Sequence, residues 1–272
     1  MTVYIAGSKG YIGQNLVPFL KEKKYTVAEL ECSEVPDLRP WDQVVNLACH
    51  GHKPGDDNLK WMLQANTIYP IHLFDNLPTG AMMIHTASSA EIYRPEMLYA
   101  KTKSLGTQYL LGKCHVAYIY SAFGGVAEFP HRFMRTAIEA AATGREMKLT
   151  TPLSIRDYIH MKYVLRGIEE LLRDQGGPKT LQFGSGRPVS MANVIGILKK
   201  ITGKDLENIE FVYLEKGSEM WEAKPPHFPD TDLEADIREE YDRCASAISS
   251  PISSGGPASL TSSESPEGGT SS

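Results

Sequence analysis

Short apolar runs alternate with helical patterns along most of the chain. Residues 3–7 (VYIAG) read as a buried strand, and the helix predicted after them carries Ile12, Leu16, Phe19 and Leu20 at helical spacing. The alternation continues, with strands predicted at 26–30, 43–48, 81–86 and 115–120 and helices at 59–77, 98–112, 132–144, 163–174 and 190–202. It predicts an α/β fold with a parallel sheet and right-handed crossovers.

Proline, glycine and low-complexity positions mark where these elements end. Pro18 should kink the first helix or mark its last turn. Gly144 suits the C-terminal cap of the helix before it. Residues 249–272 are mostly Ser, Gly, Pro, Thr and Glu, so they cannot bury enough apolar surface to offset their ordering entropy. We therefore expect a disordered tail there.

The bulk composition excludes several classes of function. Hydrophobic residues make up 42% of the chain and charged residues 22%, which is ordinary for a globular protein, and the net charge of -5 argues against a nucleic-acid footprint. No apolar run approaches the ~20 residues that span a bilayer, and the N-terminus does not have a signal-type pattern. We therefore expect a cytoplasmic protein without membrane contact. The cysteines lack metal-type spacing, which predicts plain thiols and no metal at Cys32, Cys49, Cys114 and Cys244.

Three glycines follow the first predicted strand. In a strand–turn–helix unit, such glycines permit the tight turn, the approach of backbone to a pyrophosphate and close packing of helix on strand. The helix N-terminus then presents its free N–H groups and positive dipole end to the phosphates. The spacing here is G-x-x-G-x-x-G (Gly7, Gly10, Gly13), not the commoner G-x-G-x-x-G, and three glycines also suit a plain turn.

An acidic residue, Glu31, follows the second predicted strand. A carboxylate there accepts hydrogen bonds from the adenosine ribose hydroxyls and repels a 2′-phosphate, which favours NAD over NADP. Lys9 argues the other way, because its positive charge would help to hold a phosphate. A solvated loop position is the alternative reading of Glu31.

A second grouping carries acid–base chemistry. Tyr99 and Lys103 stand four residues apart, on one face of a predicted helix. A free tyrosine has a pKa of about 10, but a neighbouring ammonium and the positive ring of an oxidised nicotinamide favour the phenolate. Tyr99 would then exchange a proton with a substrate hydroxyl or ketone, and Ser89 would position the reacting oxygen. Ser88 is the rival for the serine role, and Lys101 beside Lys103 leaves a generic charged face as the alternative.

These segments together resemble the extended short-chain dehydrogenase/reductases, the family of NAD-dependent sugar-nucleotide epimerases, dehydratases and reductases. The resemblance covers roughly residues 1–235. The segments that carry it are GSKGYIGQNL (7–16), ASSAEIY (87–93), YAKTK (99–103), IRDYIHM (155–161) and FGSG (183–186). Asn66 also stands where the family has an asparagine in the helix before the serine strand, and Asp37-Leu38 is similar to its Asp-hydrophobic pair near the adenine.

The resemblance implies a Rossmann-type domain at 1–150, with a doubly wound parallel sheet, that binds NAD or alternatively NADP. It also implies a small, trimmed C-terminal substrate lobe at 151–240 that is interleaved with this domain. It implies catalysis by Ser89, Tyr99 and Lys103. Arg156 would contact the diphosphate of a nucleotide sugar, for which its planar fork is suited, although an ion pair with Asp157 is the rival reading. Asn66 and Ser89 would also contact the substrate. The implied cofactor contacts are Gly7, Lys9, Gly10, Tyr11, Ile12, Gly13, Glu31, Asp37, Leu38, Ala48 and Lys103.

The chain also departs from the epimerases. The short connection between the second and third strands resembles the dTDP-4-keto-6-deoxysugar reductases. Tyr163 stands where epimerases carry an aspartate, and residues 215–219 (EKGSE) are at best a remnant of the usual substrate segment. These departures leave open whether the reaction is an epimerisation, a reduction or a dehydration. Two alternative functions are a catalytically silent sensor that binds the cofactor and a reductase of a non-sugar carbonyl.

Members of the family often dimerise through two helices, one of which carries the tyrosine and lysine. The resemblance therefore allows a homodimer. Leu98, Leu105 and Leu110 would serve at such an interface, or would equally belong to the core.

Overall fold

The computed structural model describes residues 1–31, 34–51, 55, 57–212 and 220–249. Three predictions therefore fall outside the described residues: the plain thiol at Cys32, the remnant segment at 215–219, and the disordered tail beyond Ser249. Cys49, Cys114 and Cys244 are free thiols. Within the described ranges, none of the helices combines the length and apolar character needed to cross a membrane.

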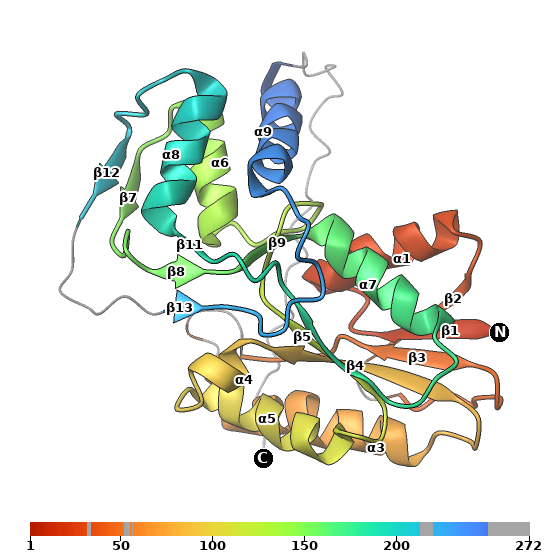
Figure 1. Cartoon of the computed structure of the whole chain (residues 1–272). Helices are drawn as coiled ribbons and strands as arrows, with labels where there is room; N and C mark the ends of the chain where they lie inside the picture. Colours follow the sequence, from red (N-terminus) through yellow and green to blue (C-terminus); the bar gives the residue numbers. More distant parts are fainter. Residues whose placement is uncertain (32–33, 52–54, 56, 213–219, 250–272) are drawn as a thin grey trace, which may run out of the picture.

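A parallel six-stranded sheet forms the centre of the molecule (Figure 1). Its strand order is β10-β5-β4-β3-β1-β2, which confirms the predicted Rossmann-type sheet. The sheet is buried on both faces, as the continuous apolar runs predict. Its strands are β1 (Thr2–Ala6), β2 (Thr26–Leu30), β3 (Gln43–Asn46), β4 (Met82–Ser88), β5 (His115–Ile119) and β10 (Thr180–Phe183).

Helices cover both faces of this sheet. One face packs against α1 (Tyr11–Glu22) and α7 (Met161–Arg173), and the other against α3 (Tyr69–Asp75) and α5 (Leu98–Leu110) (Figure 1). The helix predicted over 59–77 is interrupted: α2 (Leu59–Leu63) passes into α3 through a π-helical turn, η1 (Gln64–Ile68). Single π turns inside helices are frequent at functional sites.

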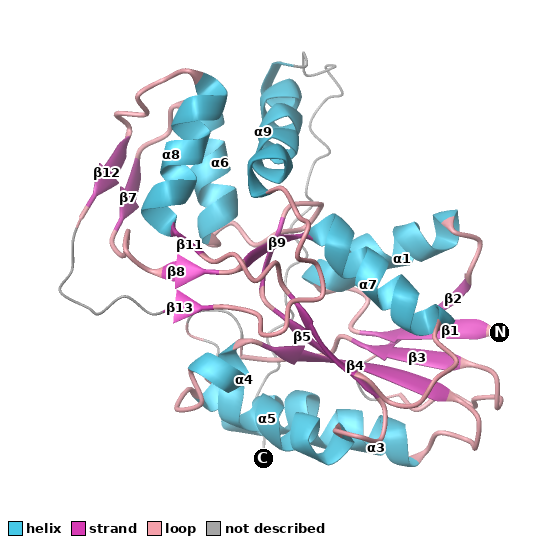
Figure 2. Cartoon of the chain, viewed as in Figure 1, coloured by secondary structure: helices cyan, strands magenta, loops and turns pink. Residues whose placement is uncertain are grey.

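A second cluster of helices packs beyond the sheet. It consists of α6 (Phe133–Thr143), α8 (Met191–Thr202) and α9 (Leu233–Ser249) (Figure 2). Gly144 caps α6 in the left-handed conformation, with φ +76°, as predicted. Pro18 lies within α1, which continues past it to Glu22. The hydrophobic pattern of the sequence did not predict α9.

Three small sheets accompany these helices, and their strands were not predicted. They pair β6 (Ser121–Phe123) with β9 (Tyr158–His160), β7 (Met147–Leu149) with β12 (Ile209–Phe211), and β8 (Ile155–Arg156) with β11 (Val189–Ser190) and β13 (Met220–Trp221). A short helix, α4 (Ala90–Tyr93), follows β4. Strands of two or three residues are too short to show an alternating pattern.

Candidate active site

The glycine turn after β1 is shaped by close backbone contacts. Gly7 has φ +82°, and a Cβ added to it would lie 2.7 Å from the backbone nitrogen of Ala48, at the end of β3. A Cβ on Gly13 would overlap the carbonyl oxygens of Gly7 and Ser8. Gly10 closes the turn by donating its N–H to the Gly7 carbonyl at 3.0 Å, and it is the N-cap of α1. The turn leaves backbone N–H groups at the helix start for an anion, as a pyrophosphate site requires.

The two residues predicted to select between NAD and NADP form an ion pair. The Lys9 ammonium contacts the Glu31 carboxylate, and their side chains are 79% and 64% exposed. Glu31 follows β2 directly, so the pair links the glycine turn to the second strand. Asp37 is exposed beyond it, whereas Leu38 is buried in the core against this part of the sheet.

Tyr11 and Ile12 direct their side chains into the protein. The Tyr11 hydroxyl donates to the Gly124 carbonyl at 2.7 Å, and Ile12 packs against the core beside α7. Only the backbone of these two residues is therefore left to face a cofactor at the turn.

Tyr99 and Lys103 lie one turn apart on α5, beside the end of β4. The Lys103 side chain is almost fully buried, and its Nζ donates to the Thr86 carbonyl of β4 at 2.8 Å. Burial of a lysine requires such a partner. The side chain of Ser88, the last residue of β4, lies beside the Tyr99 hydroxyl. Ser89 is buried at the start of α4 and donates its backbone N–H to the Ile119 carbonyl at 3.2 Å.

The pKa of Tyr99 is shifted in the direction opposite to the expected one. Burial raises it well above its ordinary value, and the nearby Cys49 and Glu91 raise it further. The Ser88 side chain and the charge of Arg132 lower it but do not outweigh burial. The predicted lowering relied on the ammonium of Lys103, which in the structure is bonded to Thr86, and on the positive ring of an oxidised nicotinamide.

Asn66 fixes the position of α5. It lies in η1, is fully buried, and exchanges hydrogen bonds of 2.9 Å with both the N–H and the carbonyl of His50. Its amide also donates to the Thr102 hydroxyl at 2.9 Å, next to Lys103. A Cβ on Gly106 would overlap the Asn66 carbonyl, so the two segments pack closely. The Asn66 amide is thus engaged by His50 and Thr102, and its contact with a substrate stays a prediction.

Two titratable groups near Lys103, the buried His85 and the half-buried Glu91, were not predicted from the sequence. Glu91 accepts the Ser88 N–H at 2.7 Å; burial raises the pKa of its carboxyl, and Lys103 lowers it. Burial and the charge of Lys103 hold the pKa of His85 well below its ordinary value, so this histidine is neutral. Its ring contacts the Asn46 amide at 3.0 Å. A signal was available, because a polar residue inside the apolar strand 82–88 indicates a buried polar contact.

Arg156 lies against an aromatic pair instead of Asp157. Its guanidinium stacks 4.2 Å from the ring of Trp221, its partner in the β8–β13 register. The Trp221 ring is in turn stacked on Tyr93, with centroids 5.9 Å apart. The Tyr93 hydroxyl exchanges hydrogen bonds with the backbone of Glu222. Arg156 is thereby held next to α4, which follows the serine strand.

Asp157 joins two segments that the sequence analysis treated separately. Its buried carboxylate accepts the N–H and the hydroxyl of Ser185 at 2.8 and 2.7 Å, the Gly186 N–H at 2.8 Å and the Ala223 N–H at 3.0 Å. The carboxylate thus ties the glycine turn at 183–186 to the segment that carries Trp221.

The fold is shared with solved nicotinamide-dependent enzymes. The Thermotoga maritima UDP-glucose 4-epimerase with UDP-glucose has a TM-score of 0.73 at 17% identity and covers 91% of this chain and 100% of its own. MoeE5, solved with UDP-glucuronic acid and NAD, has a TM-score of 0.72 at 18% identity over 91% of this chain and 100% of its own. The chain therefore shares the Rossmann-type α/β fold of these two proteins.

Two further relatives of this fold differ in cofactor and reaction. RMD from Pseudomonas aeruginosa, solved with NADPH, has a TM-score of 0.73 at 17% identity over 90% of this chain and 99% of its own. In sequence, the dTDP-glucose 4,6-dehydratase of Streptomyces griseus is 24% identical over 200 residues, 65% of this chain. That alignment spans 61% of the dehydratase. No protein-family model matches the chain.

Proposed function

We propose that the chain is an NAD(P)-dependent epimerase or ketoreductase that acts on a nucleotide-activated sugar by hydride transfer. One observation carries the proposal: the glycine turn and the Tyr99 hydroxyl lie at the carboxyl ends of β1 and β4, in one parallel sheet. With β3 between them, these strands are about 10 Å apart. Ligands of open α/β sheets bind at this edge, where the strand order reverses.

A bound nicotinamide would supply hydride transfer, and the residues present fit such a cofactor. The glycine turn would take the pyrophosphate because its backbone approaches without Cβ atoms. Glu31 would accept hydrogen bonds from the adenosine ribose, which favours NAD. Lys103 would hold the nicotinamide ribose with its buried positive charge.

Proton transfer falls to Tyr99. Because its pKa is raised, the phenol is protonated at neutral pH and is ready to donate to the oxygen of a ketone. Removing a proton from a hydroxyl in the reverse direction requires an added positive charge near the phenol, which an oxidised nicotinamide provides. The Ser88 hydroxyl, which lies beside that of Tyr99, would position the reacting oxygen, a role predicted for Ser89.

The substrate would lie between this sheet edge and the segment of β8 and β13. Arg156, stacked on Trp221, offers a guanidinium to a diphosphate. Similar structures hold UDP-glucose and UDP-glucuronic acid, which supports a nucleotide sugar as the substrate class.

Binding and turnover assays test this function. We expect NADH to bind with a lower Kd than NADPH in a fluorescence titration, because Glu31 opposes a 2′-phosphate. In a panel of UDP- and dTDP-activated sugars and their 4-keto forms, at least one should be epimerised or reduced. Cofactor binding without any turnover would instead indicate a regulatory binding protein, and failure to bind either cofactor would overturn the proposal.

We further propose that the protein forms a homodimer through α2, η1 and α5, which pack side by side. Trp61 and Ile68, seven residues apart, are 57% and 52% exposed, and Leu98 and Leu105 on α5 are 38% and 53% exposed. Leu110, the third leucine considered for this interface, is fully buried in the core. Two adjacent apolar stripes suit a two-fold interface, in which the same surface meets its copy.

Light scattering after size exclusion should give twice the mass of one chain. Leu105→Glu should give a monomer, because it places a charge in the stripe. Leu153→Glu is the matched control, since Leu153 is 56% exposed but lies before β8, outside these helices. A monomeric wild-type protein at micromolar concentration would contradict the proposal.

A further inference from the structure

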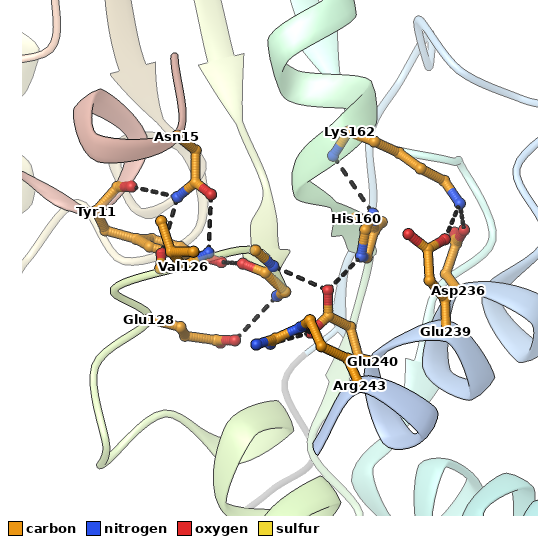
Figure 3. A network of polar contacts seen from close by, with 12 residues as sticks. Tyr11, Asn15, Val126, Glu128, His160, Lys162, Asp236, Glu239, Glu240 and Arg243 are labelled. Carbon is orange, nitrogen blue, oxygen red and sulfur yellow. Dashed lines mark hydrogen bonds and ion pairs between the residues drawn. The ribbon is translucent and has the colours of Figure 1, made fainter. Parts of the chain in front are cut away.

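A buried carboxylate on α9 contacts a turn from the middle of the chain. Glu240 is 4% exposed. Its Oε1 accepts hydrogen bonds of 2.9 Å from the Gly125 N–H and from Nε2 of His160 (Figure 3). Its Oε2 accepts the Nε–H of Arg243 at 2.9 Å. A second N–H of Arg243 also donates to Oε2, so three residues supply all the donors of this buried carboxylate.

Glu240 is ionised throughout the neutral range. Burial alone would raise the pKa of its carboxyl, but the hydrogen bonds from His160, Gly125 and Arg243 outweigh burial and hold that pKa at about 2. Hydrogen bonds to a charged group are shorter and stronger than neutral ones, so this contact fixes the turn firmly.

The turn at Gly124 and Gly125 leaves no room for side chains. Both glycines have positive φ, +81° and +71°. A Cβ on Gly124 would lie 2.5 Å from Nε2 of His160 and 2.6 Å from Oε1 of Glu240. A Cβ on Gly125 would overlap Oδ1 of Asn15. The turn is therefore held between α9 and β9 on one side and α1 on the other.

On its other side, the turn is bonded to the first turns of α1. Asn15 exchanges two hydrogen bonds of 2.8 Å with the backbone of Val126. The Tyr11 hydroxyl donates to the Gly124 carbonyl at 2.7 Å. Tyr11 directly follows Gly10, the N-cap whose neighbouring N–H groups would face the pyrophosphate. An unbroken set of buried contacts thus connects α9 with the start of α1 (Figure 3).

The acidic neighbours of Glu240 serve a different contact. Asp236 and Glu239 receive the ammonium of Lys162 at 2.6 and 2.7 Å. Together with His160 they form a group that offers ligand atoms for a metal, but the ammonium already supplies the positive charge there. Glu239 is 56% exposed and does not contact the glycine turn, which makes it a control for Glu240.

We propose that Glu240 is a positioning residue for the cofactor site. By holding the Gly124–Val126 turn against Tyr11 and Asn15, it sets the orientation of the amide groups at the N-terminus of α1. Cofactor affinity then depends on the docking of α9. The proposal rests on the proposed function for the identity of the ligand, NAD, but the mechanical connection from Glu240 to α1 is independent of it.

Glu240→Gln tests this connection in the full-length protein. The neutral amide cannot accept all three donors, so we expect the Kd for NADH and the KM for NAD to rise about tenfold, with kcat at saturating cofactor unchanged. Hydrogen–deuterium exchange should increase in peptides that cover residues 7–20. Glu239→Gln should change neither, because Lys162 keeps its contact with Asp236.

The outcomes separate this inference from the proposed function. If the wild-type protein does not bind NADH, the proposed function fails, and the exchange measurement still tests the connection. If the wild type binds and Glu240→Gln matches it in affinity and in exchange at 7–20, Glu240 does not position the turn. Should Glu240→Gln fail to fold, Glu240→Asp keeps the charge but shortens its reach, and the same two measurements apply.

Discussion

Replacing Tyr99 with phenylalanine should lower kcat by about 10²–10⁴-fold and leave NADH affinity close to that of the wild type. The change removes only the hydroxyl that we propose as the proton donor and that lies beside Ser88. The ring remains in place, so the packing of α5 against β4 is preserved. Steady-state turnover of a responsive nucleotide sugar, together with a fluorescence titration of NADH, measures both quantities.

Tyr109→Phe is the matched control for this experiment. Tyr109 lies on the same helix, but its hydroxyl donates to Asp75 at 2.7 Å on the surface, away from the site. In the same assay, Ser88→Ala should reduce kcat more than Ser89→Ala, because Ser88 is the serine in contact with Tyr99. Unchanged turnover in Tyr99→Phe would exclude Tyr99 as the acid.

Asp157→Asn should lower the free energy of unfolding by about 3 kcal/mol, a large part of the stability of a typical domain. The fully buried carboxylate accepts four hydrogen bonds, from Ser185, Gly186 and Ala223. An asparagine of the same shape turns an N–H₂ group toward some of these donors and leaves them unpaired. Urea denaturation monitored by circular dichroism measures the loss.

Asp205→Asn provides the comparison, since Asp205 is exposed in the loop after α8. The two changes are chemically identical, so the difference between them isolates the buried contacts. Equal stability of the two variants would show that the four hydrogen bonds contribute nothing beyond what water supplies.

The first half of the fold was predictable because its signals are local. The run Val3–Ala6, the glycines after it and the helical spacing of Ile12 and Leu16 each determine a nearby element, and the structure has β1, the turn and α1 there. The left-handed cap at Gly144 is equally local. By contrast, β8 and β13 have two residues each, and they exist because Arg156 and Trp221 pair although they are sixty-five positions apart in the sequence.

The chemistry of the candidate site was predictable in part. The residue types and the spacing of Tyr99 and Lys103 indicated an acid–base pair, and both are in the site beside β4. The raised pKa of Tyr99 could not be predicted from the sequence, because burial and the approach of Cys49 and Glu91 depend on how distant segments pack. The choice between Ser88 and Ser89 depends on where β4 ends, and a shift of one residue turns a strand side chain to the opposite face.

Asp157 was predicted only as a rival partner for Arg156, because the four groups that donate to its carboxylate lie 28 to 66 residues away in the sequence.

The sixth strand of the central sheet has a consequence for how this chain can be made or divided. β10 pairs with β5, and α7 covers the same face of the sheet as α1, although both follow residue 150. A fragment that stopped at that point would leave β5 with an open edge and Val3 and Ile5 partly uncovered, an arrangement that invites aggregation. The residues before position 150 therefore cannot complete their sheet without those after it, and the two parts of the chain are not exchangeable modules.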